Sequence, residues 1–119
     1  MNKKRINDWL LVAKEALEKT GVAENGEIDK TYRGQISSFG AAVVMGSLPA
    51  AVAFFSEQGG ASVKREKLIQ AMYYCISGKN LKAKEILEIV CKNNSNDLRE
   101  KFTDASIAVK LAMNFFDLV

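Results

Sequence analysis

The side chains of this sequence that could do chemistry are cations, and three of them stand close together. Lys64, Arg65 and Lys67 fall at the expected start of a helix. Cations in a first helical turn oppose the helix dipole, so local stability does not explain their presence. Lys and Arg beside the free N–H groups of a helix start attract anions such as phosphate. The triplet is therefore either a solubilising turn or a phosphate contact.

Catalytic and metal-binding residues are scarce by comparison. The chain has no histidine, which removes the commonest general base and the commonest metal ligand. Cys75 and Cys91 are too far apart to form a zinc site, and no glycine-rich phosphate loop occurs. Four carboxylates are expected at exposed helical positions beside lysines: Glu85, Glu88, Glu100 and Asp104. We therefore expect no enzyme, no cofactor and no catalytic or metal-ligating residue.

A narrow polar stripe marks the expected last helix. Its members recur at the spacing of one helical face: Arg99, Thr103, Ser106, Lys110, Asn114 and Asp117. Apolar stripes flank it on both sides, one through Phe102 and the other through Phe115. Such a helix either lies deep in a bundle or presents one side to a partner, and we favour the partner.

The composition and apolar spacing predict a single all-α domain over residues 1–119, a compact bundle of about six helices. The expected helices are residues 4–19, 28–45, a third from the Pro49 turn to Gly59-Gly60, 63–76, a fifth after Asn80 and 97–117. Ser62 and Asn80 are the expected N-caps of the fourth and fifth helices. Gly21 and Gly78 are the expected C-terminal stops of the first and fourth. Residues 21–27 read as a polar turn, and no strand is expected.

Residues 34–56 contain no charged side chain, which raises the alternative of a transmembrane span. Five polar residues, Pro49 in the middle and the lack of aromatic belts argue against it. We expect two buried helices joined tightly at residues 46–49. The bulky face is Tyr32, Ile36, Phe39 and Val43, and the small-residue face is Gly34, Ser38, Ala41 and Met45. Glycine inside a helix costs about 1 kcal/mol, so we expect a close contact on the small face, within the domain or between subunits.

Charge and cysteine usage limit the class of protein. The net charge of +3 does not by itself indicate a nucleic-acid binder, but residues 62–92 hold seven Lys/Arg against three Glu. A local basic face is therefore expected. Cys75 and Cys91 are isolated on apolar helical faces, which predicts reduced core thiols and a cytoplasmic protein. No signal peptide is visible.

Several of these residues together resemble a known family. The order Tyr32, Ile36, Phe39, Val43, Gly46-Ser47-Leu48 and Ala53-Phe54 is similar to the signature of the small helical subunit of the type III-B CRISPR effector, the Cmr complex. In the last helix Leu98-Arg99, Asp104-Ala105 and Phe115 follow the same family pattern. The chain departs from it at Gly40, where the family has proline, at Gly46-Ser47 in place of Asn-Gly, and at Asn114 in place of a basic residue.

The resemblance implies a non-catalytic subunit of an antiviral ribonucleoprotein. Copies of that subunit stack into a short filament beside the backbone subunits that carry the guide RNA. The filament helps to hold target RNA, and other subunits cut it. The implied partners are the other effector subunits, guide and target RNA and further copies of the chain, without a membrane.

The expected RNA contacts are Lys64, Arg65 and Lys67, joined by Arg33, Arg99 and Lys110 from the two helices that carry the signature. Two alternatives remain open. One is the equivalent small subunit of a type III-A complex, and the other is a helical interaction adaptor without a nucleic-acid role.

Overall fold

The computed structural model describes residues 1–57 and 63–119 of the chain. Over these residues it contains seven α-helices, α1 (Lys3–Lys19), α2 (Thr31–Ser37), α3 (Phe39–Met45), α4 (Leu48–Ser56), α5 (Glu66–Ser77), α6 (Ala83–Lys92) and α7 (Asn96–Ala112). A single 3-10 turn, η1 (Met113–Phe115), follows α7. Three two-residue strands, β1 (Ala23–Glu24), β2 (Glu27–Ile28) and β3 (Asp117–Leu118), form a small sheet. Only Ser38 separates α2 from α3, so the two form one bent rod. The predicted all-α bundle of about six helices is confirmed.

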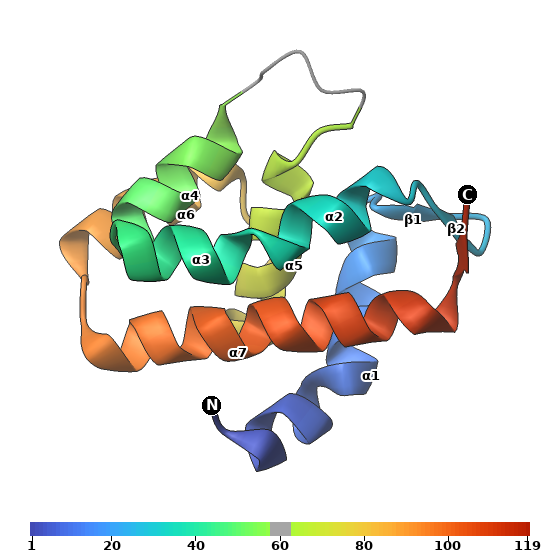
Figure 1. Ribbon diagram of the computed structural model, residues 1–119, viewed down its shortest axis with the longest axis horizontal. Coiled ribbons are helices and arrows are strands. Elements are labelled where there is room, and N and C mark those ends of the chain that lie inside the picture. The colour runs from blue at the N-terminus through green and yellow to red at the C-terminus, as the bar shows by residue number, and fades with distance from the viewer. Residues whose placement is uncertain (58–62) are drawn as a thin grey trace.

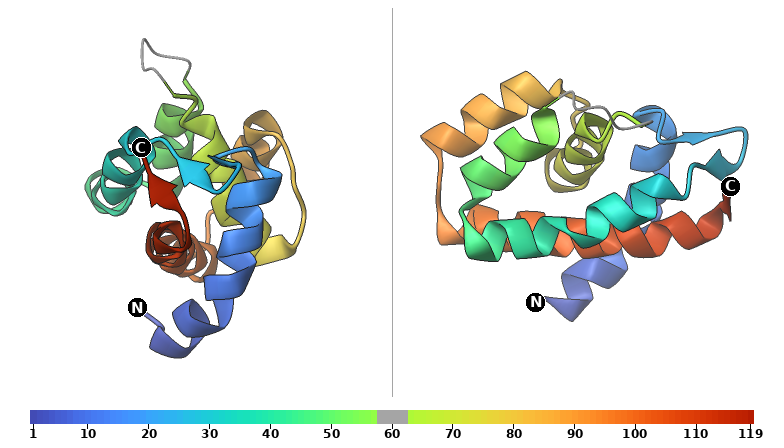
Figure 2. Two further views of the ribbon diagram at one scale, coloured as in Figure 1. Left: turned by 90° about the vertical axis from the view of Figure 1, so that its right-hand side faces the viewer. Right: turned by 45° about the horizontal axis from the view of Figure 1, so that its top comes forward.

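The bundle is built around α5, which contacts α1, α4, α6 and α7. The α2–α3 rod lies beside α7 and runs in the opposite direction, while α1 crosses behind α7 (Figure 1). Helices α4 and α6 pack together at the end of the molecule opposite the sheet (Figure 2). Three buried rings join these layers at the centre. Phe39 of α3 meets Phe55 of α4 edge-to-face at 5.3 Å and lies 6.3 Å from Phe102 of α7, between ring centroids.

The charge-free run from residue 34 to 56 folds as short helices with a sharp joint, as predicted. Gly46 leaves the helical conformation, and the Ser47 side chain accepts the N–H of Ala50 at 3.1 Å as the N-cap of α4. Pro49 lies in the first turn of α4, where its missing N–H is not needed. A second break at Ser38 was not predicted. In the part of the chain that is described, no helix combines the length and the apolar character needed to cross a bilayer.

The expectation of a simple polar turn at residues 21–27, with Ile28 opening the second helix, is wrong. Asn25 and Gly26 both adopt positive φ angles, 53° and 78°, which close a β1–β2 hairpin. Ile28 belongs to β2, and the helix begins only at Thr31. Gly21 does end the first helix, in the left-handed conformation that was expected of it.

The last helix is also shorter than predicted. It ends at Ala112, and after η1 the chain extends into β3, which pairs in parallel with β2. The backbone N–H of Asp117 donates to the Gly26 carbonyl at 3.0 Å, and that of Val119 donates to the Ile28 carbonyl at 2.9 Å. These bonds pair the backbone N–H groups of the extended chain end. Asp117 therefore lies in a strand and not on the helical polar stripe.

Other boundaries shift by a few residues. The fourth predicted helix, α5, starts at Glu66 instead of residue 63, and Gly78 ends it at a φ of 73° as expected. Helix α6 starts after Lys82, whereas the predicted cap Asn80 donates its amide to the Lys19 carbonyl at 3.4 Å. The predicted helix end at Gly59-Gly60 and the predicted cap Ser62 lie outside the described residues.

For two side chains the predicted burial is wrong. Cys91 is exposed, although it was expected in the core with Cys75. Asp104 is only 2% exposed, although it was expected on a solvated face. Its carboxylate accepts the Arg5 guanidinium at 3.1 Å and the Asn2 backbone N–H at 3.3 Å. A buried carboxylate needs such partners, and this pair fastens the start of α1 to α7.

Candidate nucleic-acid interface

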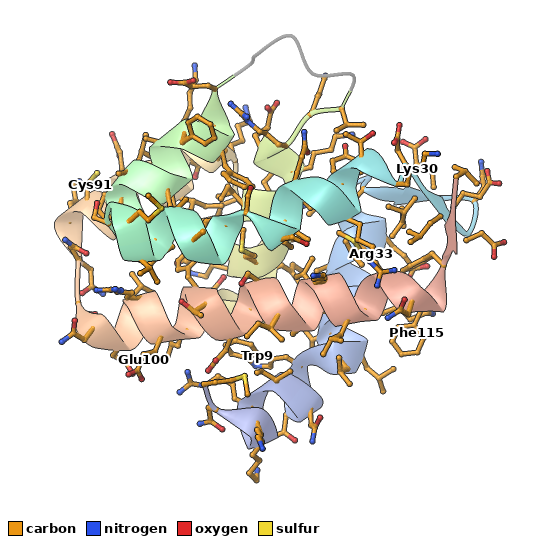
Figure 3. All side chains as sticks on the ribbon, viewed as in Figure 1. Trp9, Lys30, Arg33, Cys91, Glu100 and Phe115 are labelled. Atoms are coloured by element: carbon orange, nitrogen blue, oxygen red, sulfur yellow. The ribbon has the colours of Figure 1, made fainter. Side chains whose placement is uncertain are left out.

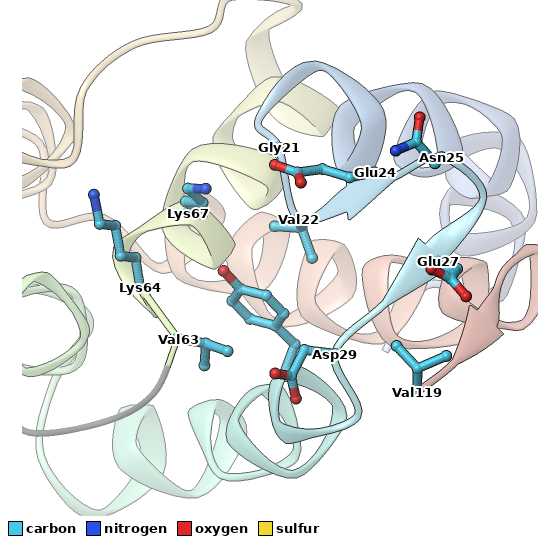
Figure 4. A pocket seen from close by; sticks show the side chains of 11 residues that line it. Gly21, Val22, Glu24, Asn25, Glu27, Asp29, Val63, Lys64, Lys67 and Val119 are labelled. Carbon is cyan, nitrogen blue, oxygen red and sulfur yellow. The ribbon is translucent and has the colours of Figure 1, made fainter.

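A hollow of about 440 Å³ lies between the start of α5, the β1–β2 hairpin and the start of α2 (Figure 4). It falls within the size range typical of small-ligand pockets. Two lysines and three acidic residues line it, Lys64, Lys67, Glu24, Glu27 and Asp29, and Glu24 lies beside Lys67. The buried ring of Tyr32 forms part of its wall.

Lys64 and Lys67 reach this hollow because of where α5 begins. Lys64 lies in the two-residue approach to the helix, and Lys67 is its second residue. Lys64 is exposed and Lys67 is half-buried. Neither ammonium group is within ion-pair distance of a carboxylate among residues 1–57 and 63–119. Within these residues the two ammonium groups are unpaired, but three carboxylates line the same hollow, so an anion is favoured only next to the lysines.

The ammonium of Lys67 and the carboxylate of Glu24 meet above Gly21. A Cβ at Gly21 would lie 3.3 Å from the Lys67 Nζ atom and 3.9 Å from the Glu24 Oε1 atom. The two charged groups are nevertheless farther than 4 Å apart, since they form no salt bridge. The absence of a side chain at Gly21 lets the end of the Lys67 side chain pack against the Gly21 backbone.

Tyr32 lines the hollow together with Lys64 and Lys67. The residue is only 5% exposed, and the hydroxyl lies beside the backbone N–H of Lys64. Burial raises the pKa of the Tyr32 phenol above its ordinary value, so the group keeps its proton at physiological pH. A protonated phenol can donate a hydrogen bond to an anion held by the two lysines.

The three carboxylates of the hollow are not equivalent. Asp29 accepts the backbone N–H of Thr31 at 2.9 Å, which lowers the pKa of its carboxyl and holds it beside the start of α2. Glu24 and Glu27 are exposed on the hairpin strands. Of the three, Glu24 is the carboxylate that adjoins Lys67 at Gly21. It is the acidic group best placed to share a ligand with the cations.

Arg65 is held differently from its two neighbours. Its guanidinium lies 4.4 Å above the Phe54 ring and 5.9 Å from the Phe55 ring, measured to the centroids. It also pairs with Glu57 at 3.9 Å, and its Nε atom is buried without a hydrogen-bond partner among the described groups. Arg65 therefore stacks on α4 and covers Phe54, and it does not line the hollow with Lys64 and Lys67.

The three further candidates lie along α7. Arg33 of α2 donates to the side chain of Asn114 at 3.4 Å, and Lys110 precedes Asn114 by one helical turn (Figure 3). Arg33 and Lys110 therefore share one end of the seam between α2 and α7. Arg99 is exposed near the start of α7, about 16 Å away along the helix axis from Lys110. The six predicted residues thus form separate groups and not one patch.

The polar stripe of α7 follows the seam between that helix and the α2–α3 rod. Near its start, Arg99 and Thr103 share a small hollow with Val43 and Val44 of α3. Ser106, in the middle, is buried, and its hydroxyl donates to the Thr103 carbonyl at 2.7 Å. The apolar stripe through Phe102 lies in the core, whereas Leu111 and Phe115 of the other stripe stay about half exposed. The helix therefore combines both alternatives, one apolar side buried and one partly open.

Exposed apolar side chains gather at two ends of the molecule. Val44 and Met45 end α3 and are 73% and 89% exposed. At the opposite end of the molecule, Phe115 of η1 lies beside Lys14 of α1 (Figure 3). Leu11 of α1 and Leu111 of α7 are also exposed. These two apolar ends are available to partners.

The arrangement can bind an anion that also carries hydroxyl groups, through charge and hydrogen bonds alone. Within the described residues, no group of three or more side chains is placed to ligate a metal ion. Sequence reasoning found Lys64 and Lys67 but assigned Tyr32 to packing only, and it missed Glu24 and Asp29. The Asn25-Gly26 pair was the signal that could have revealed the hairpin carrying Glu24.

Comparison of the chain with family models, curated proteins and solved structures finds no match. The case for a function therefore rests on the signature residues and on the geometry of the site.

Proposed function

We propose that this chain is a non-catalytic small subunit of a type III-B CRISPR ribonucleoprotein effector of the Cmr type. It stacks along the complex in the cytoplasm and helps to hold target RNA during antiviral defence. One observation carries the RNA-binding part of the proposal. Lys64 and Lys67, without ion-pair partners in the described chain, converge with the protonated hydroxyl of Tyr32 on one hollow.

The signature residues that suggested this family behave as packing residues, which supports the proposal. Ile36, Phe39, Val43 and Leu48 are all buried in the core. Phe54, which closes the signature, is 52% exposed and is covered on one face by Arg65. A signature made of core positions preserves a fold, while exposed basic residues supply the contacts to RNA.

The distribution of cations suits contact with a backbone and not with bases. Lys64 and Lys67, the pair Arg33 and Lys110, and Arg99 lie at separate places on the surface. Such contacts position a strand without reading its sequence. In an RNA-guided complex this is sufficient, because pairing with the guide supplies the specificity. Repetition along stacked copies would strengthen contacts that are weak in one subunit.

The two apolar ends support stacking of copies. Val44 and Met45 lie at one end of the long axis, and Phe115 lies at the other. Contacts between different patches of identical subunits are head-to-tail, and such contacts extend into filaments when they do not close. The same ends would serve the alternatives, a type III-A small subunit or an adaptor without a nucleic-acid role. Those alternatives differ from the proposal in the proteins and the RNA that would bind the chain.

Affinity purification of the tagged chain from its own cells tests the proposal. We expect it to recover large effector subunits together with guide RNA, and we expect genes for them beside its own gene. A matched variant with Val44→Asp and Met45→Asp should stay folded, since both side chains are exposed, but should recover several-fold less of the complex. Recovery of proteins without RNA would favour the adaptor, and recovery of a type III-A complex would replace III-B.

A further inference from the structure

We propose that the hollow beside Lys67 binds one ribose-phosphate unit of an RNA strand and reads its 2′-hydroxyl through Glu24. The inference rests on the proposed function, because it takes the ligand to be RNA. It adds a property that phosphate contacts do not have, a preference for RNA over DNA at this subunit.

The distribution of charge in the hollow dictates how such a ligand lies. A phosphate is attracted to Lys64 and Lys67 and repelled by the three carboxylates of the hollow. The carboxylates accept hydrogen bonds and cannot donate them when ionised. A ligand that carries both an anion and a hydroxyl donor can meet both kinds of group. A nucleotide with a free 2′-hydroxyl has both, and a deoxynucleotide within a strand has only the anion.

Glu24 is the acceptor that the structure leaves free for this hydroxyl. Asp29 is occupied by the Thr31 N–H, as described above. The Glu24 carboxylate has no cation within ion-pair distance in the described chain, although Lys67 lies close by over Gly21. Because Glu24 and Lys67 both line the hollow, a sugar bound in it would touch both groups. Its hydroxyl would then donate to Glu24 while the attached phosphate meets Lys67.

Tyr32 provides the third contact. Its ring is buried in the wall of the hollow, and its hydroxyl lies beside the backbone N–H of Lys64. Because the ring is almost fully buried, the hydroxyl is held in place before a ligand arrives. It is a positioned donor for a phosphate oxygen, and it would serve RNA and DNA equally.

Nuclear magnetic resonance on the ¹⁵N-labelled full chain tests the inference directly. The probes are a short oligouridylate, the matched oligodeoxyuridylate and free uridine monophosphate, each titrated at low salt. We expect the oligouridylate to shift the amide signals of Gly21, Val22 and Glu24. We expect it to bind about tenfold more tightly than the deoxy strand, the effect of one hydrogen bond to a charged group.

Two variants separate the sugar contact from the phosphate contacts. Glu24→Ala should abolish the preference for the ribose strand and leave the deoxy strand bound at least as tightly as before, because it removes a repulsive charge. Tyr32→Phe should weaken both strands by a similar factor of a few. The matched control Glu88→Ala makes the same charge change on the exposed outside of α6 and should keep the preference.

The outcomes distinguish this inference from the proposed function. Equal binding of the two strands by the unaltered chain, or a preference that survives Glu24→Ala, overturns the sugar contact. The proposed function would still stand if the purified complex contains RNA. If uridine monophosphate binds as tightly as the strand, a free nucleotide replaces RNA as the ligand and the strand assignment is overturned. If no probe shifts the amides around Gly21, the hollow is not a ribose-phosphate site.

Discussion

The two faces of the α2–α3 rod contrast sharply, although they share the same fourteen-residue stretch of helix interrupted only at Ser38. The inner face, represented by Ile36, Phe39 and Val43, is at most 2% exposed and touches the centre of the core. The outer face, with Gly34, Ala41 and Met45 among its members, is open to solvent. Nothing in the described structure lies within 4 Å of a Cβ placed on Gly34 or Gly40.

This difference shows what folding of the single chain explains and what it does not. Burial accounts for the bulky inner face, since each large apolar side chain removed from water contributes about 1.5–3 kcal/mol. Glycine inside a helix costs about 1 kcal/mol against alanine, and no neighbour in the described chain offsets that loss at Gly34. The described chain thus shows no close contact at Gly34, and the expected contact between subunits stays a prediction.

The largest expected effect belongs to the inner face. Phe39→Ala should lower the free energy of unfolding by about 3–5 kcal/mol, because it opens a cavity between the rings of Phe55 and Phe102. The matched outer variant Val44→Ala should change it by less than about 0.5 kcal/mol. Urea unfolding followed by circular dichroism measures both. Equal losses for the two variants would contradict the division into faces.

A smaller effect of opposite sign is expected at Gly34. Gly34→Ala should stabilise the isolated chain by about 0.5–1 kcal/mol, because alanine favours the helix and meets no neighbour. It should weaken incorporation into the assembled complex, where the extra methyl group would hold the partner away. The control Gly26→Ala also meets no neighbour, but its φ of 78° strains alanine, so it should destabilise. Destabilisation by Gly34→Ala would point to a contact within the chain.

The smallest expected effect is a difference in reactivity between the two thiols. One of them is buried on α5 and the other is exposed on α6, so they show the same contrast between an inner and an outer face. Burial raises the pKa of Cys75 to about 12, whereas Cys91 is exposed. A thiol reagent at neutral pH should therefore modify only Cys91 in the folded chain and both cysteines in denaturant. Because the folded pKa of Cys75 is raised, its stabilising effect is complete below about pH 9 and is lost as the pH rises toward 12. Modification of Cys75 without unfolding would contradict its burial.

Helices could be predicted from the sequence wherever apolar residues recur at helical spacing. The predictions failed where contacts between segments far apart in the chain determine the local structure. Strand β3 forms only because residue 117 meets residue 26 across the chain. Asp104 is buried because Arg5, close to it only in the folded chain, neutralises it. Cys91 follows Val90 directly and is therefore rotated about 100° away from the buried stripe of α6.

The site was predictable in part for the same reason. Lys64 and Lys67 stand out as cations at a helix start, and the structure places both at the hollow. Arg65, between them, is drawn away by the Phe54 ring, which no local pattern indicates. The spacing of Tyr32 predicted that its ring packs in the core, but no sequence pattern predicted a role for its hydroxyl. Glu24 reaches the site only through a hairpin whose pairing with the chain end is a tertiary contact.

The most direct test of the central claim is the salt dependence of target-RNA binding by the assembled complex. The variant carries Lys64→Glu and Lys67→Glu, and it spares Arg65 because that residue stacks on α4. The control carries Lys3→Glu and Lys79→Glu, two exposed lysines outside the hollow. We predict weaker binding for any guide, with the slope of log K against log salt smaller by about 0.7 per lost contact and copy, and an unchanged slope for the control. An assembled variant that binds RNA with the unaltered slope would contradict the claim.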